Sequence, residues 1–260
     1  MSLRTALVSL GLVALAAASF AAAPANSFNL VSTAGKNIGN AAYTITKDKN
    51  GYHIVGKFQY RFGSSVQANS AGDTHMGSNV AFNEGQFIED FKVSEDGNFL
   101  SGYTQNSTNQ MMTSFQPNKA GTEVVINQIQ GGVGQAHNLA MPKPNFLVVP
   151  DFDPATLQLF LTTALAHPHE DKTYLFLIPA GSNPRGKESP AYVILQLAPD
   201  TPAGTLDGKS INLMHYVLSY HTGKADVYTD TTGTLMQADM DPLNASYIRA
   251  KFALAATPAK

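Results

Sequence analysis

The 260-residue sequence contains no cysteine. A disulfide framework is therefore excluded, and so is any chemistry that needs a thiolate. The folded state must be stabilised by its core alone, which requires a sizeable core.

Charged residues are scarce, at 14% of the chain against about 25% in ordinary soluble domains. The formal net charge is only −2. Such a balance provides no electrostatic footprint for nucleic acid or for an anionic lipid surface, so we expect no nucleic-acid partner. Ser, Thr, Asn and Gln supply the polar surface instead, as in residues 101–110.

Long apolar runs are missing except at the N-terminus. One positive charge, at Arg4, precedes an apolar run over Ala6–Ala18 and a small-residue stretch over Ser19–Ala25. This order predicts a secretory signal peptide over residues 1–25, and hence an exported protein that is periplasmic or extracellular. The apolar run is too short to span a bilayer. No later run is long enough either, so we expect no transmembrane segment in residues 26–260.

The remaining sequence is dominated by short alternating segments separated by turn signals, which is typical of antiparallel sheets. Tyr52–Phe62 alternates most cleanly, and Asn50–Gly51 before it marks a hairpin turn. We expect an all-β, mainly antiparallel fold, with a large curved sheet or open barrel of roughly a dozen strands. Two Gly- and Asn-containing stretches, Gly63–Thr74 and Gly131–Pro144, are interpreted as surface loops.

One helix is predicted, over Asp153–His167. Asp153 is a good N-cap residue, and Pro154 occupies the favoured first helical position. Its apolar residues make one face, which we expect to pack on the concave side of the sheet: Leu157, Phe160, Leu161, Ala164 and Leu165. We treat 26–260 as one domain. The alternative is two lobes, 26–150 and 168–260, joined by the helix at 153–167.

Two segments resemble exported bacterial families of unknown function. Ala34–Lys47 with Gly51–Val55 is similar to their opening hairpin. Their closing meander is similar to Tyr216–Tyr220, Ala225–Asp230 and Gly233–Met236. Tyr228 stands where those families usually have Trp. The resemblance covers about a third of the chain and implies a long antiparallel sheet curved like a half-barrel, in outline like periplasmic carriers of lipids and lipoproteins. It implies no activity.

The predicted strand Ile211–Tyr220 is apolar on both faces, so each of the two faces must be shielded from water. The helix can cover one face, and the other needs a second layer, a partner or an apolar ligand. We expect a concave, aromatic-lined surface for an amphiphilic ligand. An ordinary second core layer is the alternative. The candidate ligand-binding residues are Phe58, Tyr60, Phe62, Met214, Tyr216, Leu218 and Tyr220.

The densest set of metal-ligating residue types is His167, His169, Glu170 and Asp171. Two histidines on either side of a helix-breaking proline can project from one bend toward a metal ion. The alternative is that they complement the dipole at the end of the helix.

Other catalytic motifs are absent. Gly181–Lys187 imitates a phosphate-binding loop, but Glu188 occupies the position that needs Ser or Thr. No G-x-S-x-G or H-E-x-x-H pattern occurs. Three hypotheses follow. The first is a non-catalytic carrier of a lipid or other amphiphile, which we expect to need no cofactor and to be a monomer or to associate weakly. The second is a metal-dependent hydrolase at the His167–Asp171 segment, and the third is a structural or interaction protein of the cell envelope.

Overall fold

The structure is a computed structural model. It describes residues 26–60, 85–96, 98–107, 110–140, 146–149, 153–166, 173–177, 191–220 and 223–255. The predicted signal peptide (1–25) and the predicted loop at Gly63–Thr74 lie outside these ranges.

One sheet of 17 strands accounts for most of the described chain, together with the helix α1 (Pro154–Ala166) and the short 3-10 helix η1 (Asp241–Leu243). The all-β, antiparallel prediction with one helix is confirmed, and the number of strands is larger than expected. The first nine strands are β1 (Asn26–Ser32), β2 (Asn37–Asp48), β3 (Gly51–Tyr60), β4 (Gly85–Val93), β5 (Phe99–Asn106), β6 (Met111–Pro117), β7 (Glu123–Gln130), β8 (Val133–Ala140) and β9 (Phe146–Val149). The others are β10 (Thr173–Leu177), β11 (Ala191–Leu197), β12 (Ala203–Leu206), β13 (Lys209–Tyr220), β14 (Gly223–Asp230), β15 (Leu235–Met240), β16 (Ala245–Arg249) and β17 (Phe252–Leu254).

The N-terminal strands form an antiparallel meander in which each of β1 to β8 pairs with the next. β1 also pairs with β16, and the sheet continues from there through β15, β14 and β13 to β11 and β10. The pairing of β10 with β9 is parallel. Both halves of the chain therefore share one sheet, joined at β1.

A branch leaves the sheet at β13. The first half of β13 pairs with β12 and the second half with β11, while β17 pairs with the free side of β12. Since β12 and β17 have four and three residues, this branch is short.

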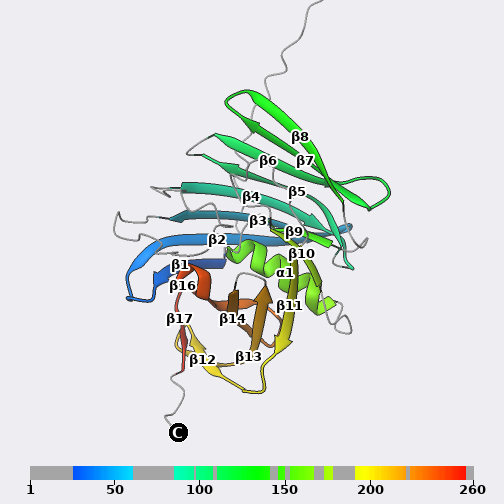
Figure 1. Cartoon of the computed structure of the whole chain (residues 1–260). Helices are drawn as coiled ribbons and strands as arrows, with labels where there is room; N and C mark the ends of the chain where they lie inside the picture. Colours follow the sequence, from blue (N-terminus) through cyan, green and yellow to red (C-terminus); the bar gives the residue numbers. More distant parts are fainter. Residues whose placement is uncertain are drawn as a thin grey trace, which may run out of the picture.

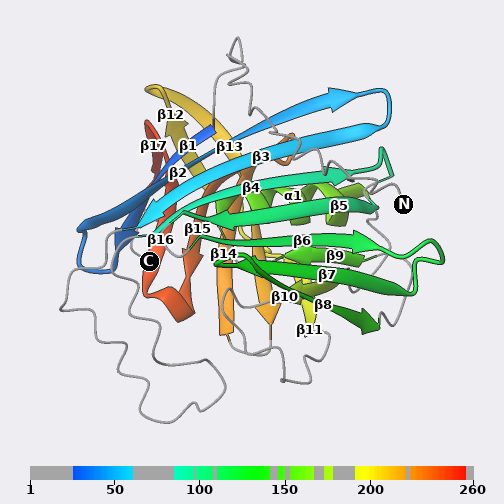
Figure 2. The same cartoon turned by 90° about the horizontal axis from the view of Figure 1, so that it is seen from above.

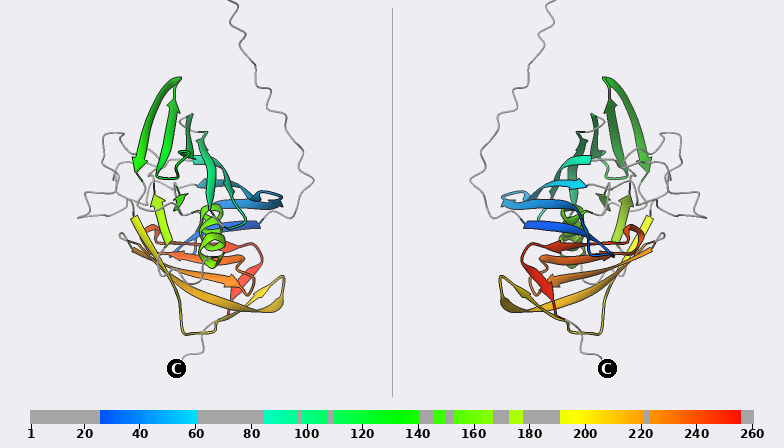
Figure 3. Two further views of the ribbon diagram at one scale, coloured as in Figure 1. Left: turned by 90° about the vertical axis from the view of Figure 1, so that its right-hand side faces the viewer. Right: turned by 90° about the vertical axis from the view of Figure 1, so that its left-hand side faces the viewer.

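The sheet curves around α1 (Figures 1 and 3). Strands β1 to β8 lie above the helix in Figure 1, and β13 to β17 lie below it. Seen from above, β13 and β14 run across the direction of β2 to β7 (Figure 2), as in orthogonal packing of two sheet layers. α1 contacts β2 and β3 on one side and β15 on the other, while β9 lies beside β5. The helix therefore lies on the concave side of the sheet.

Burial of the helix extends beyond the predicted face. Leu157, Phe160 and Leu161 are each 1% exposed, as predicted. Thr156 and Gln158 are buried as well, as is every residue from Asp153 to Leu161. The first two turns are therefore enclosed on all sides, whereas the predicted amphipathic helix would have had a wet face. Leu165, from the predicted apolar face, is 37% exposed.

The N-terminus of α1 sits directly against β3 at Gly56. A Cβ atom at Gly56 would lie 2.6 Å from the Cβ of Ala155, so glycine is what allows this approach. Asp153 caps the helix as predicted, because its Oδ1 accepts hydrogen bonds from the backbone N–H groups of Ala155 (2.6 Å) and Thr156 (3.2 Å).

Two hydrophobic clusters cover the two faces of β13. Leu218 belongs to the main core around the helix, with Tyr216 packed against it. The second cluster comprises Leu213, Met236 and Phe252, flanked by Leu206, Ile211, Ile248 and Leu254. A second core layer, supplied by β12, β15, β16 and β17, therefore covers the second face of β13 at Ile211 and Leu213 only.

One interpretation of local sequence was wrong. The stretch Gly131–Pro144 contains the strand β8, preceded by a two-glycine turn in which Gly131 and Gly132 have φ values of 56° and 81°.

Candidate functional site

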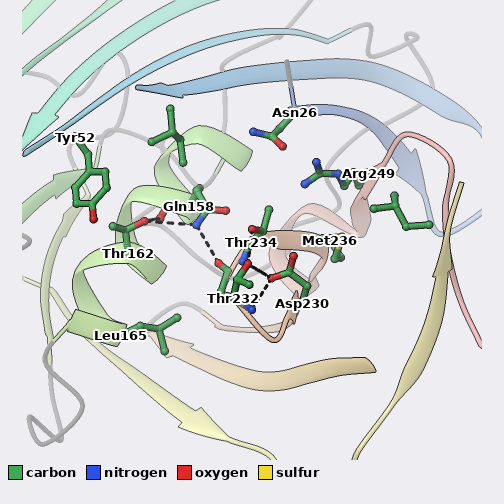
Figure 4. Close-up of a pocket in the computed structure, with 13 residues that line it drawn as sticks. Asn26, Tyr52, Gln158, Thr162, Leu165, Asp230, Thr232, Thr234, Met236 and Arg249 are labelled. Carbon is green, nitrogen blue, oxygen red and sulfur yellow. Dashed lines mark hydrogen bonds between the residues drawn. The ribbon is translucent and has the colours of Figure 1, made fainter. Parts of the chain in front are cut away.

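A half-open cleft of about 510 Å³ lies between the C-terminal half of α1 and the turn that joins β14 to β15 (Figure 4). Strands β1, β2, β3, β12 and β16 complete its walls. The residues that line it are Asn26, Ile45, Tyr52, Gln158, Thr162, Leu165, Leu206, Asp230, Thr232, Gly233, Thr234, Met236 and Arg249.

The floor of the cleft is a turn organised by Asp230. Oδ1 of Asp230 accepts hydrogen bonds from the backbone N–H groups of Thr232 and Thr234, both at 2.9 Å, and from the Thr232 hydroxyl at 2.7 Å. Gly233 has a φ of 85°, which disfavours other residues, and a Cβ there would lie 2.8 Å from a methyl carbon of Leu165. The turn is thus fixed in shape and held close to the helix.

Gln158 joins this turn to the helix and to β2. Its Oε1 accepts hydrogen bonds from the Tyr43 hydroxyl and from the backbone N–H of Leu235, both at 2.8 Å. Its Nε2 donates to the carbonyl oxygen of Gly233 at 3.0 Å (Figure 4). Since Gln158 is 5% exposed, these bonds form in a dry environment and hold the inner wall of the cleft rigidly.

Arg249 and Asp230 bring opposite charges to the cleft. One guanidinium nitrogen of Arg249 donates to the carbonyl oxygen of Leu235 at 3.3 Å. Burial raises the pKa of the Tyr43 phenol, and this effect is opposed by Arg249 and reinforced by Asp230. Tyr43 is thus neutral, and the charged groups of the wall are the carboxylate in the turn and the guanidinium on β16.

The lining of the cleft is chemically mixed. Hydroxyl, amide and charged groups come from the Asp230–Thr234 turn, Gln158 and Arg249, whereas Ile45, Leu165 and Leu206 supply apolar surface. A molecule that carries both polar and apolar groups matches this lining.

The seven predicted ligand-binding residues are distributed differently. Phe58 and Tyr60 pack with Phe87, at ring-centroid distances of 4.5 Å for Phe58–Phe87 and 4.8 Å for Phe58–Tyr60. Phe58 and Tyr60 are 4% and 7% exposed, so neighbouring side chains cover their rings. Leu218 is fully buried, and Met214 and Tyr216 are partly buried on β13. None of these five lines the cleft. Phe62 and the side chain of Tyr220 lie outside the described parts of the chain.

The predicted metal-ligating residues, His167, His169, Glu170 and Asp171, also lie outside the described residues. Within the ranges that are described, no group of three or more His, Asp or Glu side chains is arranged to hold a metal ion.

A charged cluster lies on the sheet face opposite the main core, centred on His215 of β13. Nδ1 of His215 is 2.8 Å from Oδ1 of Asp200, and Nε2 is 2.9 Å from Oδ1 of Asp226. The imidazole stacks on Tyr228 with a centroid distance of 4.6 Å. Burial together with Asp226, Asp239 and Asp200 raises the pKa of Tyr228 to about 12. Since ionised carboxylates only accept hydrogen bonds, both ring nitrogens donate and His215 is an imidazolium.

We expect His215 to titrate above the usual histidine range. Burial opposes its charge, but the hydrogen bonds to Asp226 and Asp200 outweigh burial and raise the pKa above 6.5. The stability that it contributes is thus full below about pH 6.5 and is lost as pH rises through the higher folded-state value. An NMR titration of the imidazole carbon proton measures this pKa, and Asp200→Asn is expected to lower it. A wild-type value at or below 6.5 would contradict the assignment.

A pair of buried carboxyl groups lies beneath the start of α1. Asp153 and Glu89 of β4 are each 1% exposed, and their side chains are hydrogen-bonded to one another. Glu89 lies opposite Gly56 in the β3–β4 ladder, directly where the helix approaches. Burial raises the pKa of Asp153, although bonds from Glu89, Thr156 and Ala155 oppose the rise. Two ionised carboxylates cannot donate to one another, so the pair holds a proton.

Comparison with known proteins gave no match to any family model, any curated protein or any solved structure. The resemblance noted in the sequence therefore stays a prediction. In the described part of the chain, no helix combines the length and the hydrophobicity needed to cross a bilayer.

Sequence reasoning missed the residues that make the cleft. Asp230–Gly233 has the sequence of an ordinary tight turn, and Arg249 lies in an ordinary strand. Only Gln158 offers a signal, because an amide among the apolar residues of a predicted core helix must find buried partners.

Proposed function

We propose that this protein is an exported, non-catalytic binding protein that holds a small amphiphilic molecule in the cleft between α1 and the β14–β15 turn. The mixed polar and apolar lining of the cleft carries the proposal. Export rests on the signal-peptide pattern of residues 1–25.

The size and rigidity of the cleft support binding. About 510 Å³ falls within the range of ordinary small-molecule sites. The walls are fixed by the Gln158 hydrogen bonds and by the Asp230 turn, so little ordering free energy is lost when a ligand enters. Ile45, Leu165 and Leu206 would contact the apolar part of the ligand, and Arg249 would donate to its polar part.

The polar groups of the cleft suit recognition better than catalysis. Asp230 Oδ1 already accepts three hydrogen bonds from its own turn, which makes this oxygen a structural acceptor. The hydroxyls of Thr162, Thr232 and Thr234 and the guanidinium of Arg249 supply hydrogen-bonding groups for a ligand.

Arg249→Ala is expected to weaken binding of an anionic amphiphile by about tenfold to a hundredfold, because a charge-assisted hydrogen bond is lost. The measurement is fluorescence titration with a dansylated fatty acid, alongside native mass spectrometry of the purified protein for retained lipid. Lys251→Ala is the control, since it removes one positive charge from an exposed residue outside the cleft.

Two outcomes would contradict the proposal. One is a wild-type protein that neither retains lipid nor binds the probe. The other is a probe affinity that Arg249→Ala leaves unchanged, which would place the ligand elsewhere.

A further inference from the structure

The described sheet has three terminal strands, and they differ sharply in length. β9 has four residues and β17 has three, whereas β8 has eight. β8 forms the outer margin of the sheet at the top of Figure 1 and pairs only with β7 among the described strands. Short edges offer little backbone for pairing with another chain, but an eight-residue edge offers a full strand.

Most side chains of β8 are exposed. Val133 is 65% exposed, and Gly134, Gln135, Ala136, Asn138 and Ala140 are exposed as well. Leu139 is partly buried and packs against the main core, which anchors one end of the strand. Among the described residues, the edge of β8 opposite β7 therefore has no partner strand.

The composition of β8 lacks the usual protection of an edge strand. Its sequence, VGQAHNLA, has no Asp, Glu, Lys, Arg or Pro, the residues by which soluble proteins normally prevent edge-to-edge pairing. A strand that pairs antiparallel with its own copy sets each charge near an identical charge, which is destabilising. Because β8 contains no Asp, Glu, Lys or Arg, pairing with its own copy brings no such like charges together. The strand is therefore complementary to itself.

We propose that β8 is a self-association edge, on which β8 of a second copy pairs antiparallel about a two-fold axis perpendicular to the sheet. With the axis at Ala136, each Ala136 faces its own copy, and Val133 faces Leu139 of the second copy. The exposed apolar side chain of Val133 then meets another apolar side chain, and the smallest pair lies on the axis. The two sheets join into one continuous sheet, an isologous arrangement that closes as a dimer.

The dimer is weak, because one strand pair contributes far less area than the roughly 1,600 Å² of a standard interface. Sedimentation velocity of the purified protein from micromolar to millimolar concentration is expected to show a reversible rise toward the dimer. Gln135→Lys should raise the dissociation constant by about tenfold or more, since it charges the edge. Gln105→Lys is the matched control, because Gln105 is also exposed but lies on β5, which is paired on both sides.

The absence of cysteine allows a second, independent test. Ala136→Cys places one thiol on the proposed axis, where directly opposed Cβ atoms are about 4.5–5.5 Å apart. Mild oxidation is expected to give a covalent dimer much faster than with Gln105→Cys. Equal cross-linking rates, or a protein that stays monomeric at millimolar concentration, would overturn the proposal. So would a wild-type edge that captures an added extended peptide but never a second copy.

Discussion

Replacing Phe160 by alanine is expected to lower the free energy of unfolding by about 3–5 kcal/mol. Phe160 is 1% exposed and lies in α1, which the curved sheet encloses from β2, β3 and β15. Because the surrounding strands are tied into one sheet, they cannot collapse into the space that the ring leaves. Urea denaturation followed by circular dichroism measures the change.

Leu197→Ala is the control for this experiment. Leu197 is 59% exposed on β11, so its truncation is expected to change stability by no more than about 0.5 kcal/mol. A loss below about 1 kcal/mol for Phe160→Ala would show that the helix is not enclosed as described.

Replacing Glu89 by glutamine is expected to stabilise the protein at neutral pH and to change how its stability depends on pH. The buried Glu89–Asp153 pair holds a proton that the unfolded chain releases, and the pKa of Asp153 is raised. A raised folded-state pKa means that stability is full below the unfolded value near 4 and is lost as pH rises through the folded value. The glutamine amide donates to Asp153 without a proton to lose. We therefore expect Glu89→Gln to be more stable than the wild type by about 1–3 kcal/mol at pH 7.

The decisive measurement is the difference in unfolding free energy between the two proteins across pH 4 to pH 8, the range over which a carboxyl of raised pKa titrates. It should grow in favour of Glu89→Gln as pH rises. Glu95→Gln serves as the control, because Glu95 is an exposed partner of Lys47 and its removal should give a nearly constant, small difference. Parallel pH curves for Glu89→Gln and the wild type would show that the pair does not share a proton.

The fold class was accessible from the sequence because it depends on local pattern. Alternation over Tyr52–Phe62 places Ile54, Phe58 and Tyr60 in the core, as the structure has them. Asp153 and Pro154 fix the start of α1 within one residue, since capping is a property of neighbouring residues.

The missed strands show where local pattern fails. β8 alternates neither polarity nor size, because both of its faces are largely wet, and its glycines suggest a loop. The apolar periodicity of the predicted helix also gave no indication that Thr156 and Gln158 are enclosed. A polar residue in a helix indicates a wet face unless its buried partners are known, and three partners of the Gln158 side chain are 75 or more residues away.

The cleft could not be predicted because it is assembled from distant segments. Asn26, Gln158, Asp230 and Arg249 come from four different elements or turns, and no pair of them has a spacing with chemical meaning. The predicted ligand-binding residues were chosen for their aromatic and apolar character. In the structure the side chains of Phe58, Tyr60 and Leu218 are buried in the core.

The position of β1 also determines the order in which the chain can reach its final form. β1 lies between β2 and β16, with Phe28 opposite both Ala41 and Arg249. One neighbour of β1, the strand β2, is synthesised directly after it. The other neighbour, β16, is the sixteenth of the seventeen described strands. Pairing of strands so far apart in the sequence makes folding slow. Closing the long intervening chain costs conformational entropy before the contacts between the strands compensate for it. The architecture therefore delays completion of the sheet until β16 has been synthesised.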